Sequence, residues 1–203
     1  MKPQTLIFIG RSGCGKGTQS RLMDEYLKRE DSNKRKIYYS ETGAGFREFI
    51  KRDLHSSRLS KEIYDRNERQ PEYLAIWMWS NRFMEDLTGE EHIMIDGTPR
   101  SLTEAIVLQN ALAFYGRHAN IIFLDVVRDV VVKRLLDRGR GVAARADDAD
   151  TEKINKRLDW FETDVAPAIE YFRNQPGHNF MHINGDQSIE KVHADILAGL
   201  KTE

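Results

Sequence analysis

The residues between positions 10 and 18 have the types and spacing of a phosphate-binding loop. They read Gly-Arg-Ser-Gly-Cys-Gly-Lys-Gly-Thr and follow the apolar run 5–9, which is typical of a buried strand. Glycine lets backbone N–H groups converge on a phosphate, and a helix that begins at the loop directs its positive end to the same point. Lys16 adds a mobile charge for the β- and γ-phosphates, and Thr18 adds a hydroxyl near a metal ion. We therefore expect a phosphate to be bound here by Gly13, Cys14, Gly15, Lys16, Gly17 and Thr18.

Two carboxylates stand at the ends of later apolar runs. Asp96 ends the run that begins at His92, and Asp125 follows the run 119–124. In a parallel sheet covered by helices, ligands bind beyond the carboxyl ends of the strands. We therefore expect Gly10, Asp96 and Asp125 to lie at one edge of the sheet.

The composition is that of an ordinary globular protein. The chain has 203 residues, a net charge of −1 and a single cysteine, Cys14. This charge gives no reason to expect nucleic acid or an anionic membrane as a partner. One cysteine cannot form a disulfide within the chain, and no segment approaches transmembrane length. We expect one α/β core in a cytoplasmic protein.

Short apolar runs alternate along the chain with segments of helical periodicity. This alternation predicts the α/β class with a doubly wound, five-stranded parallel sheet. The apolar stripe between Ile154 and Phe172 indicates one long helix with a kink at Pro167. The expected strands are 5–9, 37–40, 92–95, 119–124 and 180–183, and the expected helices begin near 17 or cover 43–54, 74–87, 102–115, 130–137, 154–172 and 188–200.

Two segments lack an apolar period. The stretch from 55 to 70 is polar, and residues 138–150 are rich in Gly, Arg and Asp. The second segment is interpreted as a loop or a lid, with Gly139 and Gly141 as candidate hinges.

Several motifs together resemble the adenylate kinase family of nucleoside monophosphate kinases. Gly-Lys-Gly-Thr-Gln at 15–19 and Asp-Gly-Thr-Pro-Arg at 96–100 carry the resemblance. Thr42-Gly43 followed by Arg47 is similar to the family's acceptor-phosphate motif, and residues 184–188 are similar to the loop that closes on the donor base. Arg134, Arg138, Arg145 and Arg157 are similar to the lid arginines of the family. The resemblance runs from residue 5 to about residue 200.

The resemblance implies ATP-dependent phosphoryl transfer to a nucleoside monophosphate, with AMP as first choice and Mg²⁺ as cofactor. It implies a monomer with a core at 1–40, 73–138 and 151–203, an acceptor-binding insert at about 41–72 and a lid at about 139–150. The lid has no cysteine set, so no zinc site is expected. Transfer between two phosphate chains concentrates negative charge, which independently predicts arginines from separate elements.

The resemblance also implies a role for each matching residue. The implied catalytic residues are Lys16, Arg100, Arg138, Arg145 and Arg157. ATP is expected on Gly13 to Thr18 with Arg134, Asp186 and Gln187. The acceptor is expected on Thr42, Gly43, Arg47, Gly97, Arg100 and Glu104. Thr18 and, through water, Asp96 are expected to hold the metal.

The chain departs from the family pattern at four positions. Ala44 replaces an aspartate, Thr98 replaces an aromatic residue, Glu68 stands where a glycine precedes the acceptor-side proline by three, and Glu104 stands where the adenine-reading glutamine falls. A carboxylate only accepts hydrogen bonds, so it suits the two adjacent donors of guanine better than the N1 acceptor of adenine. We therefore expect AMP as acceptor, with weaker rejection of GMP or dGMP than is usual in the family.

Two alternatives stay open at this point. One is a kinase of the same fold that acts on GMP, dGMP or another small acceptor. The other is a nucleotide-binding regulator without turnover. The set of arginines argues against the regulator, whereas Ala44 leaves it open. An assay over the common nucleoside monophosphates distinguishes these functions.

Overall fold

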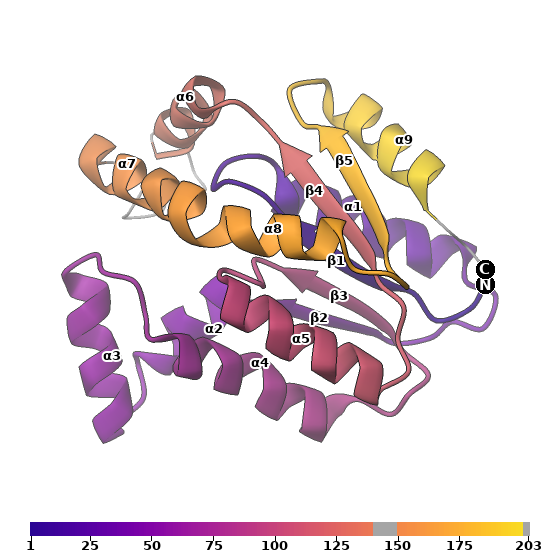
Figure 1. Cartoon of the computed structure of the whole chain (residues 1–203), viewed down its shortest axis with the longest axis horizontal. Coiled ribbons are helices and arrows are strands. Elements are labelled where there is room, and N and C mark those ends of the chain that lie inside the picture. The colour runs from indigo at the N-terminus through magenta and orange to yellow at the C-terminus, as the bar shows by residue number, and fades with distance from the viewer. Residues whose placement is uncertain (140–149, 201–203) are drawn as a thin grey trace.

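The computed structural model describes residues 1–139 and 150–200, with only the backbone at 138 and 139. Five strands form one sheet in the order β2-β3-β1-β4-β5, and every described pairing is parallel (Figure 1). The five predicted strands and the predicted fold class are confirmed. The strands are β1 Thr5–Ile9, β2 Ile37–Glu41, β3 His92–Asp96, β4 Asn120–Asp125 and β5 Asn179–Asn184.

Helices connect the strands and cover both faces of the sheet (Figure 1). They are α1 Lys16–Glu30, α2 Thr42–Phe49, α3 His55–Asp65, α4 Glu72–Asp86, α5 Leu102–Phe114, α6 Arg128–Gly139, α7 Thr151–Trp160, α8 Ala166–Arg173 and α9 Ile189–Gly199, with a π-helical turn η2 at Phe161–Val165 between α7 and α8. Among the described helices, none is both long and apolar enough to cross a membrane.

The alternation of side chains along β1 divides the hydrophobic core into two layers. Leu6 and Phe8 pack with apolar residues of α1, α6, α7 and α9, whereas Ile7 and Ile9 pack with α4, α5, η2 and α8. All four side chains are at most 2% exposed. Burial on both faces explains why β1 is a continuous apolar run rather than an alternating one. β1 is therefore held rigidly at the centre of the sheet, directly before the glycine-rich loop.

The segment between β2 and α4 differs from the prediction. α2 ends at Phe49 rather than at residue 54, because the amides of Lys51 and Arg52 bond to carbonyls three residues back and tighten the last turn. Residues 55–65 form α3, which the sequence analysis missed. Leu59 and Ile63 are spaced as on one helical face and could have indicated α3, but the residues that α3 buries are Ser57 and Ser60.

The long helix after residue 150 is irregular, but the irregular turn comes before the proline at which a kink was expected. The irregular turn is η2 at Phe161–Val165, and Pro167 lies in the first turn of α8. Proline lacks the N–H that a continuous helix needs at that position. The wider π-helical turn before it accommodates this loss within one continuous run of helix.

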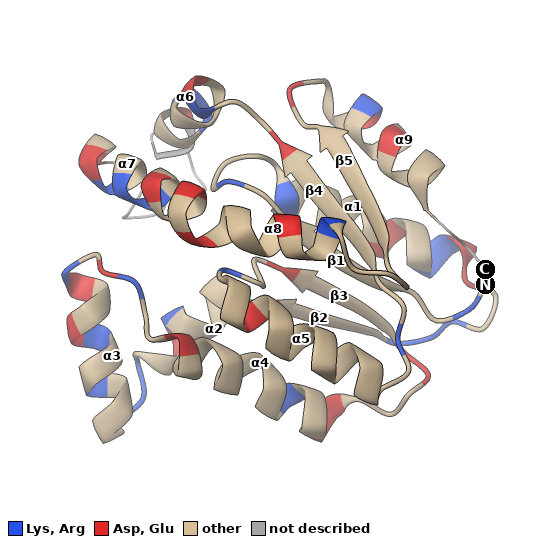
Figure 2. Cartoon of the chain, viewed as in Figure 1, with Lys and Arg blue, Asp and Glu red and all other residues tan. Residues whose placement is uncertain are grey.

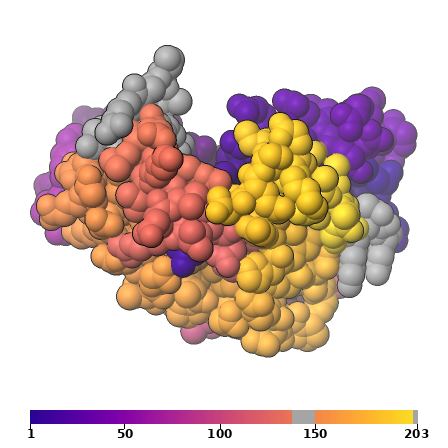
Figure 3. Space-filling view, turned by 90° about the horizontal axis from the view of Figure 1, so that it is seen from above, coloured from indigo at the N-terminus to yellow at the C-terminus, as the bar shows by residue number. Residues whose placement is uncertain are grey.

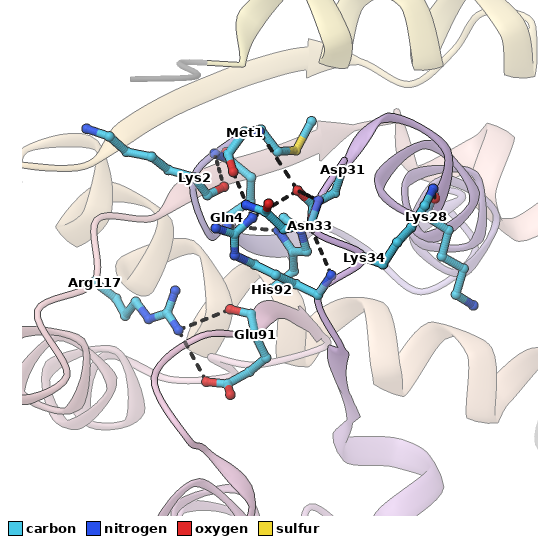
Figure 4. A network of polar contacts seen from close by, with 11 residues as sticks. Met1, Lys2, Gln4, Lys28, Asp31, Asn33, Lys34, Glu91, His92 and Arg117 are labelled. Carbon is cyan, nitrogen blue, oxygen red and sulfur yellow. Dashed lines mark hydrogen bonds and ion pairs between the residues drawn. The ribbon is translucent and has the colours of Figure 1, made fainter.

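A polar network lies at the opposite end of the sheet from the glycine-rich loop (Figure 4). His92 accepts a bond from the Gln4 backbone N–H at Nδ1, 2.9 Å away, and its Nε2 lies 3.3 Å from Asp31. Asp31 also accepts from Arg35 and lies 3.8 Å from the amino group of Met1. Because Nδ1 is an acceptor, His92 is neutral here and carries its proton on Nε2.

Candidate active site

A cleft of about 1000 Å³ opens beyond the carboxyl ends of β1, β2 and β3. Figure 2 shows basic segments on the β1–α1 loop, on α2 and on the loop before α5, which are three separate elements around this end of the sheet. Most of the predicted site residues that the structure describes line this cleft. They are Gly13, Cys14, Gly15, Lys16, Gly17, Thr18, Gly43, Arg47, Asp96, Gly97, Arg100, Glu104, Arg134, Arg157 and Gln187.

The other predicted site residues do not line the cleft or lie outside the described residues. Thr42 is buried, and its hydroxyl is hydrogen-bonded to the Thr98 hydroxyl. Asp186 pairs with Arg134 at the rim. The Arg138 side chain, Arg145 and nearly all of the expected lid lie outside the described residues, so their roles stay predictions.

The β1–α1 loop depends on glycine at two positions in particular. Gly13 has φ +85°, and a Cβ there would lie 2.9 Å from Leu135 Cγ. Gly15 has φ +105° and precedes α1 without any side-chain cap. The N–H groups of Lys16 and Gly17 come before the first amide that bonds back, Thr18 N–H to the Gly15 carbonyl at 3.0 Å, so this end of α1 is suited to an anion.

Lys16 is held by the loop itself. Its Nζ donates to the carbonyl of Gly10 at 2.7 Å and to that of Arg11 at 3.0 Å. The Cys14 thiol is buried and lies 3.7 Å from the same ammonium. Neutral carbonyls position this charge without neutralising it, which leaves it suited to a phosphate chain above the loop.

Asp96 lies beside the first turn of α1. A Cβ on Gly17 would come within 3.8 Å of its Oδ2, which also accepts a bond from the Tyr39 hydroxyl at 3.4 Å. Burial raises the pKa of Asp96, and the nearby charge of Lys16 opposes that rise. Bound cations would favour the ionised carboxylate further.

The oxygen donors at this point suit Mg²⁺. Asp96 offers a carboxylate, and Thr18 of the same cleft offers a hydroxyl. Among residues 1–139 and 150–200, no group of three or more His, Cys, Asp or Glu side chains forms a metal cage. Magnesium in phosphoryl-transfer sites is held by one or two carboxylates together with substrate phosphates, so the donor set fits this ion.

Two arginines converge in the part of the cleft next to Gly43, where the acceptor is predicted to bind. A Cβ on Gly43 would lie 3.3 Å from Arg47 Nη1 and 3.5 Å from Arg100 Nη2, so both guanidinium groups stand over Gly43. Arg47 is paired with Glu41 at 3.0 Å, and Arg100 Nε donates to the Gly97 carbonyl at 2.8 Å. Two guanidinium groups at one point are suited to binding a dianionic phosphate through bidentate hydrogen bonds.

Glu104 lies beneath these arginines and is 2% exposed. Its Oε1 accepts from the Trp79 indole at 3.1 Å and from the Thr98 hydroxyl at 3.3 Å, and its Oε2 accepts from the Arg100 backbone N–H at 2.5 Å. Burial raises the pKa of this carboxyl group, and the Arg100 amide opposes the rise. A bidentate contact with guanine would have to displace Trp79 and Thr98 from Oε1, and the base-reading role stays a prediction.

One end of the cleft, where the donor base is predicted to bind, is formed by α6 and the loop after β5. Arg134 donates to the Gly185 carbonyl at 3.2 and 3.3 Å. Gln187 donates to the Asn184 carbonyl at 2.8 Å. Gly185 packs directly on the core, because a Cβ there would lie 2.6 Å from Val126 Cγ2. These contacts place the predicted adenine-binding residues along one wall.

Comparison with known proteins agrees with this geometry. Residues 8–176 match the family model described as adenylate kinase. The chain belongs to the adenylate kinase family. It is 33% identical to adenylate kinase 1 of Nostoc sp., over 96% of this chain and 97% of that protein. It is 31% identical to the adenylate kinase of Corynebacterium diphtheriae (96% and 98%) and 30% identical to that of Flavobacterium psychrophilum (92% and 93%).

Several cleft residues of this adenylate kinase family member were missed by the sequence analysis. Tyr39 and Glu41 are two residues apart at the end of β2, so their side chains point to the same face of the sheet, and both line the cleft. This spacing could have indicated them as site residues. Arg69 pairs locally with Glu72 at 3.3 Å, but the partners that bring it to the cleft are distant in sequence. It pairs with Asp164 of η2 at 2.7 Å and donates to the Arg100 carbonyl at 3.1 Å.

Proposed function

We propose that this chain catalyses ATP-dependent transfer of a phosphoryl group to AMP, giving two molecules of ADP. The observation that carries the proposal is the pairing of two anion sites in one cleft. The loop with Lys16 stands on the donor side, and Arg47 and Arg100 stand on the acceptor side. The relatives named adenylate kinase span nearly the whole chain and support the same reaction.

In this proposal the residues act mainly by positioning and by neutralising charge. The N-terminus of α1 and Lys16 bind the donor phosphates, and Arg47 and Arg100 bind the acceptor phosphate. Thr18 and, through water, Asp96 are the residues that would hold Mg²⁺. When bound, this ion neutralises charge on the β- and γ-phosphates.

The other assignments complete the proposal. Arg134 with Asp186 and Gln187 forms the adenine wall of the donor site, and Arg157 joins the transferring group from α7. Residues 41–72 act as the acceptor-binding insert, and 139–150 act as the lid with Arg138 and Arg145. The monomeric state and the cytoplasmic location stay predictions.

A steady-state assay over AMP, GMP, dGMP, CMP and UMP with ATP and Mg²⁺ tests the proposal. We expect the highest kcat/KM for AMP, and a loss of activity when Mg²⁺ is chelated. A higher kcat/KM for GMP or dGMP would favour the alternative acceptor. No turnover with any acceptor would favour the regulator without activity.

A further inference from the structure

The phosphate-binding loop is tied to the rest of the molecule by Arg11. Its Nε and Nη2 both donate to Glu162 Oε1, at 3.1 and 2.7 Å. Its Nη1 donates to Asp125 Oδ1 and to the Val126 carbonyl, both at 3.2 Å. The guanidinium lies over the Phe161 ring, 4.5 Å from the ring centroid. One side chain therefore joins the loop to the end of β4 and to η2.

The backbone of Arg11 is bound on the other side, toward the cleft. Its carbonyl accepts from Lys16 Nζ at 3.0 Å and from the Cys14 N–H at 3.2 Å. The side chain is only 16% exposed, and a planar fork with partners on several sides has little freedom to move. Fixing this side chain therefore restricts the carbonyl that holds the Lys16 ammonium.

The turn η2 joins α7, which packs Ile154 and Leu158 in one layer of the core, to α8, which packs in the other layer. Phe161 is 5% exposed and stacks on Phe123 of β4, with ring centroids 6.5 Å apart. Arg157 lies one helical turn before Phe161 and lines the cleft. Arg11 holds η2 through Glu162, and Arg157 lies one turn before η2. Arg11 therefore helps to set the direction from which the Arg157 side chain enters the cleft.

We infer that Arg11 is a positioning residue for phosphoryl transfer, because it holds the loop with Lys16 and the helix with Arg157 in a fixed relation. This inference rests on the proposed function. Arg11 is not assigned to a phosphate, since all three of its nitrogens already donate to protein oxygens. In Figure 3 a small part of the indigo N-terminal segment is visible between the coral and orange segments, in agreement with a loop held between β4–α6 and α7–α8.

The structure offers a matched control for this arginine. Arg117 lies at the opposite end of the sheet, is 9% exposed, and pairs with Glu91 at 3.2 Å. It also donates to the Gly89 carbonyl at 2.8 Å. The two arginines thus have similar burial and a similar set of partners, but only Arg11 belongs to the phosphate-binding loop.

The test compares Arg11→Ala, Glu162→Ala, the double variant and Arg117→Ala by steady-state kinetics and thermal unfolding. We expect Arg11→Ala to lower kcat roughly tenfold to a hundredfold, because a small misplacement of reacting groups has effects of this size. The KM values for ATP and AMP should stay within about twofold, since neither substrate touches Arg11. Arg117→Ala should lower the melting temperature but keep the wild-type kcat.

The double variant decides whether the two residues act as one unit. Loss of kcat in Glu162→Ala, and a double variant no slower than Arg11→Ala, support the inference. A kcat in the Arg11 and Glu162 variants equal to that of Arg117→Ala overturns it, as do fully additive losses. Glu162 is 47% exposed, so Glu162→Ala carries the test even if Arg11→Ala does not fold. Absence of wild-type turnover would refute the proposed function, whereas wild-type turnover that these variants leave unchanged would refute this inference alone.

Discussion

Lys16 is the residue whose charge the proposed reaction uses most directly. Its ammonium rests on the carbonyls of Gly10 and Arg11, so its removal breaks only contacts within the loop. We expect Lys16→Met to lower kcat about a hundredfold to a thousandfold, as for removal of one strong stabilising donor. The melting temperature should change little. Lys28→Met on the exposed face of α1 is the control, and near-wild-type activity of Lys16→Met would contradict the role of the loop.

For Glu104 the sequence predicts a base-reading role, whereas the structure shows a carboxylate already bonded to Trp79, Thr98 and the Arg100 amide. Glu104→Gln places an amide among three donors, so one buried donor loses its acceptor at a cost of about 1–3 kcal/mol in unfolding free energy. Because Oε1 is already occupied, we expect the ratio of kcat/KM for AMP over GMP to change less than about threefold. Denaturant unfolding and kinetics with both acceptors provide the measurement. A large shift toward AMP would instead support direct reading of the base.

The glycine-rich loop could be predicted from sequence because its geometry depends on neighbouring residues. Glycines, a lysine and a strand-to-helix boundary all lie within residues 5–18. The surroundings of Glu104 could not be predicted in this way, because Trp79 comes from α4 and the Arg100 amide from a separate turn. Spacing in the sequence gave the position of the carboxylate but not its partners.

At the scale of elements, one ion pair joins the segment before α4 to η2. Arg69 and Asp164 are 30% and 27% exposed, so their pair contributes about 1 kcal/mol or less to stability. Arg69 also donates to the Arg100 carbonyl, which belongs to the proposed acceptor site. We therefore expect Arg69→Ala to raise the KM for AMP several-fold with little change in melting temperature.

The matched control for Arg69→Ala is Arg58→Ala. Arg58 lies on α3 and forms an exposed ion pair with Asp53, which precedes the helix. That change should leave the KM for AMP unchanged. An equal effect of both substitutions would show that general loss of surface charge, rather than the contact with Arg100, determines acceptor binding.

Helix α3 was not predicted, and the side chains that it buries are polar. α3 presents Ser57 and Ser60 to its neighbours, and Gln70 bonds to both the hydroxyl and the carbonyl of Ser60. Leu59 and Ile63 are four residues apart on α3, but Leu59 is 47% exposed, so burial on this helix does not follow its apolar pattern. The strands and α4, α5 and α9 were found because they bury apolar side chains at regular spacing.

At the scale of the whole molecule, the network around His92 makes stability depend on pH. Burial lowers the pKa of His92 from its ordinary value of 6.5, although Asp31 opposes this. The unfolded chain therefore binds a proton at a higher pH than the folded protein, so the unfolding free energy should fall as pH decreases below 6.5. Arg35 and Arg117 also disfavour the charged ring. Denaturant unfolding between pH 7 and pH 5 measures this decrease, which His92→Gln should reduce.

Asp31 causes a second decrease of the unfolding free energy at lower pH. The backbone N–H of Arg35 is the largest cause that lowers its pKa, from 3.8 to about 2. Its stabilising contribution is present above pH 3.8 and is lost as the pH falls toward 2. Asp31→Asn should remove this second decrease. An unfolding free energy that is independent of pH below 6.5 in the wild type would contradict both assignments.

The central claim is that one cleft transfers a phosphoryl group from ATP to AMP. It is tested most directly by ³¹P NMR of the wild-type protein with ATP, AMP and Mg²⁺. The account predicts that ATP and AMP are consumed in equal amounts, that two ADP form for each pair, and that ATP alone stays intact. Release of inorganic phosphate from ATP in the absence of AMP, or no consumption of either nucleotide, would contradict it.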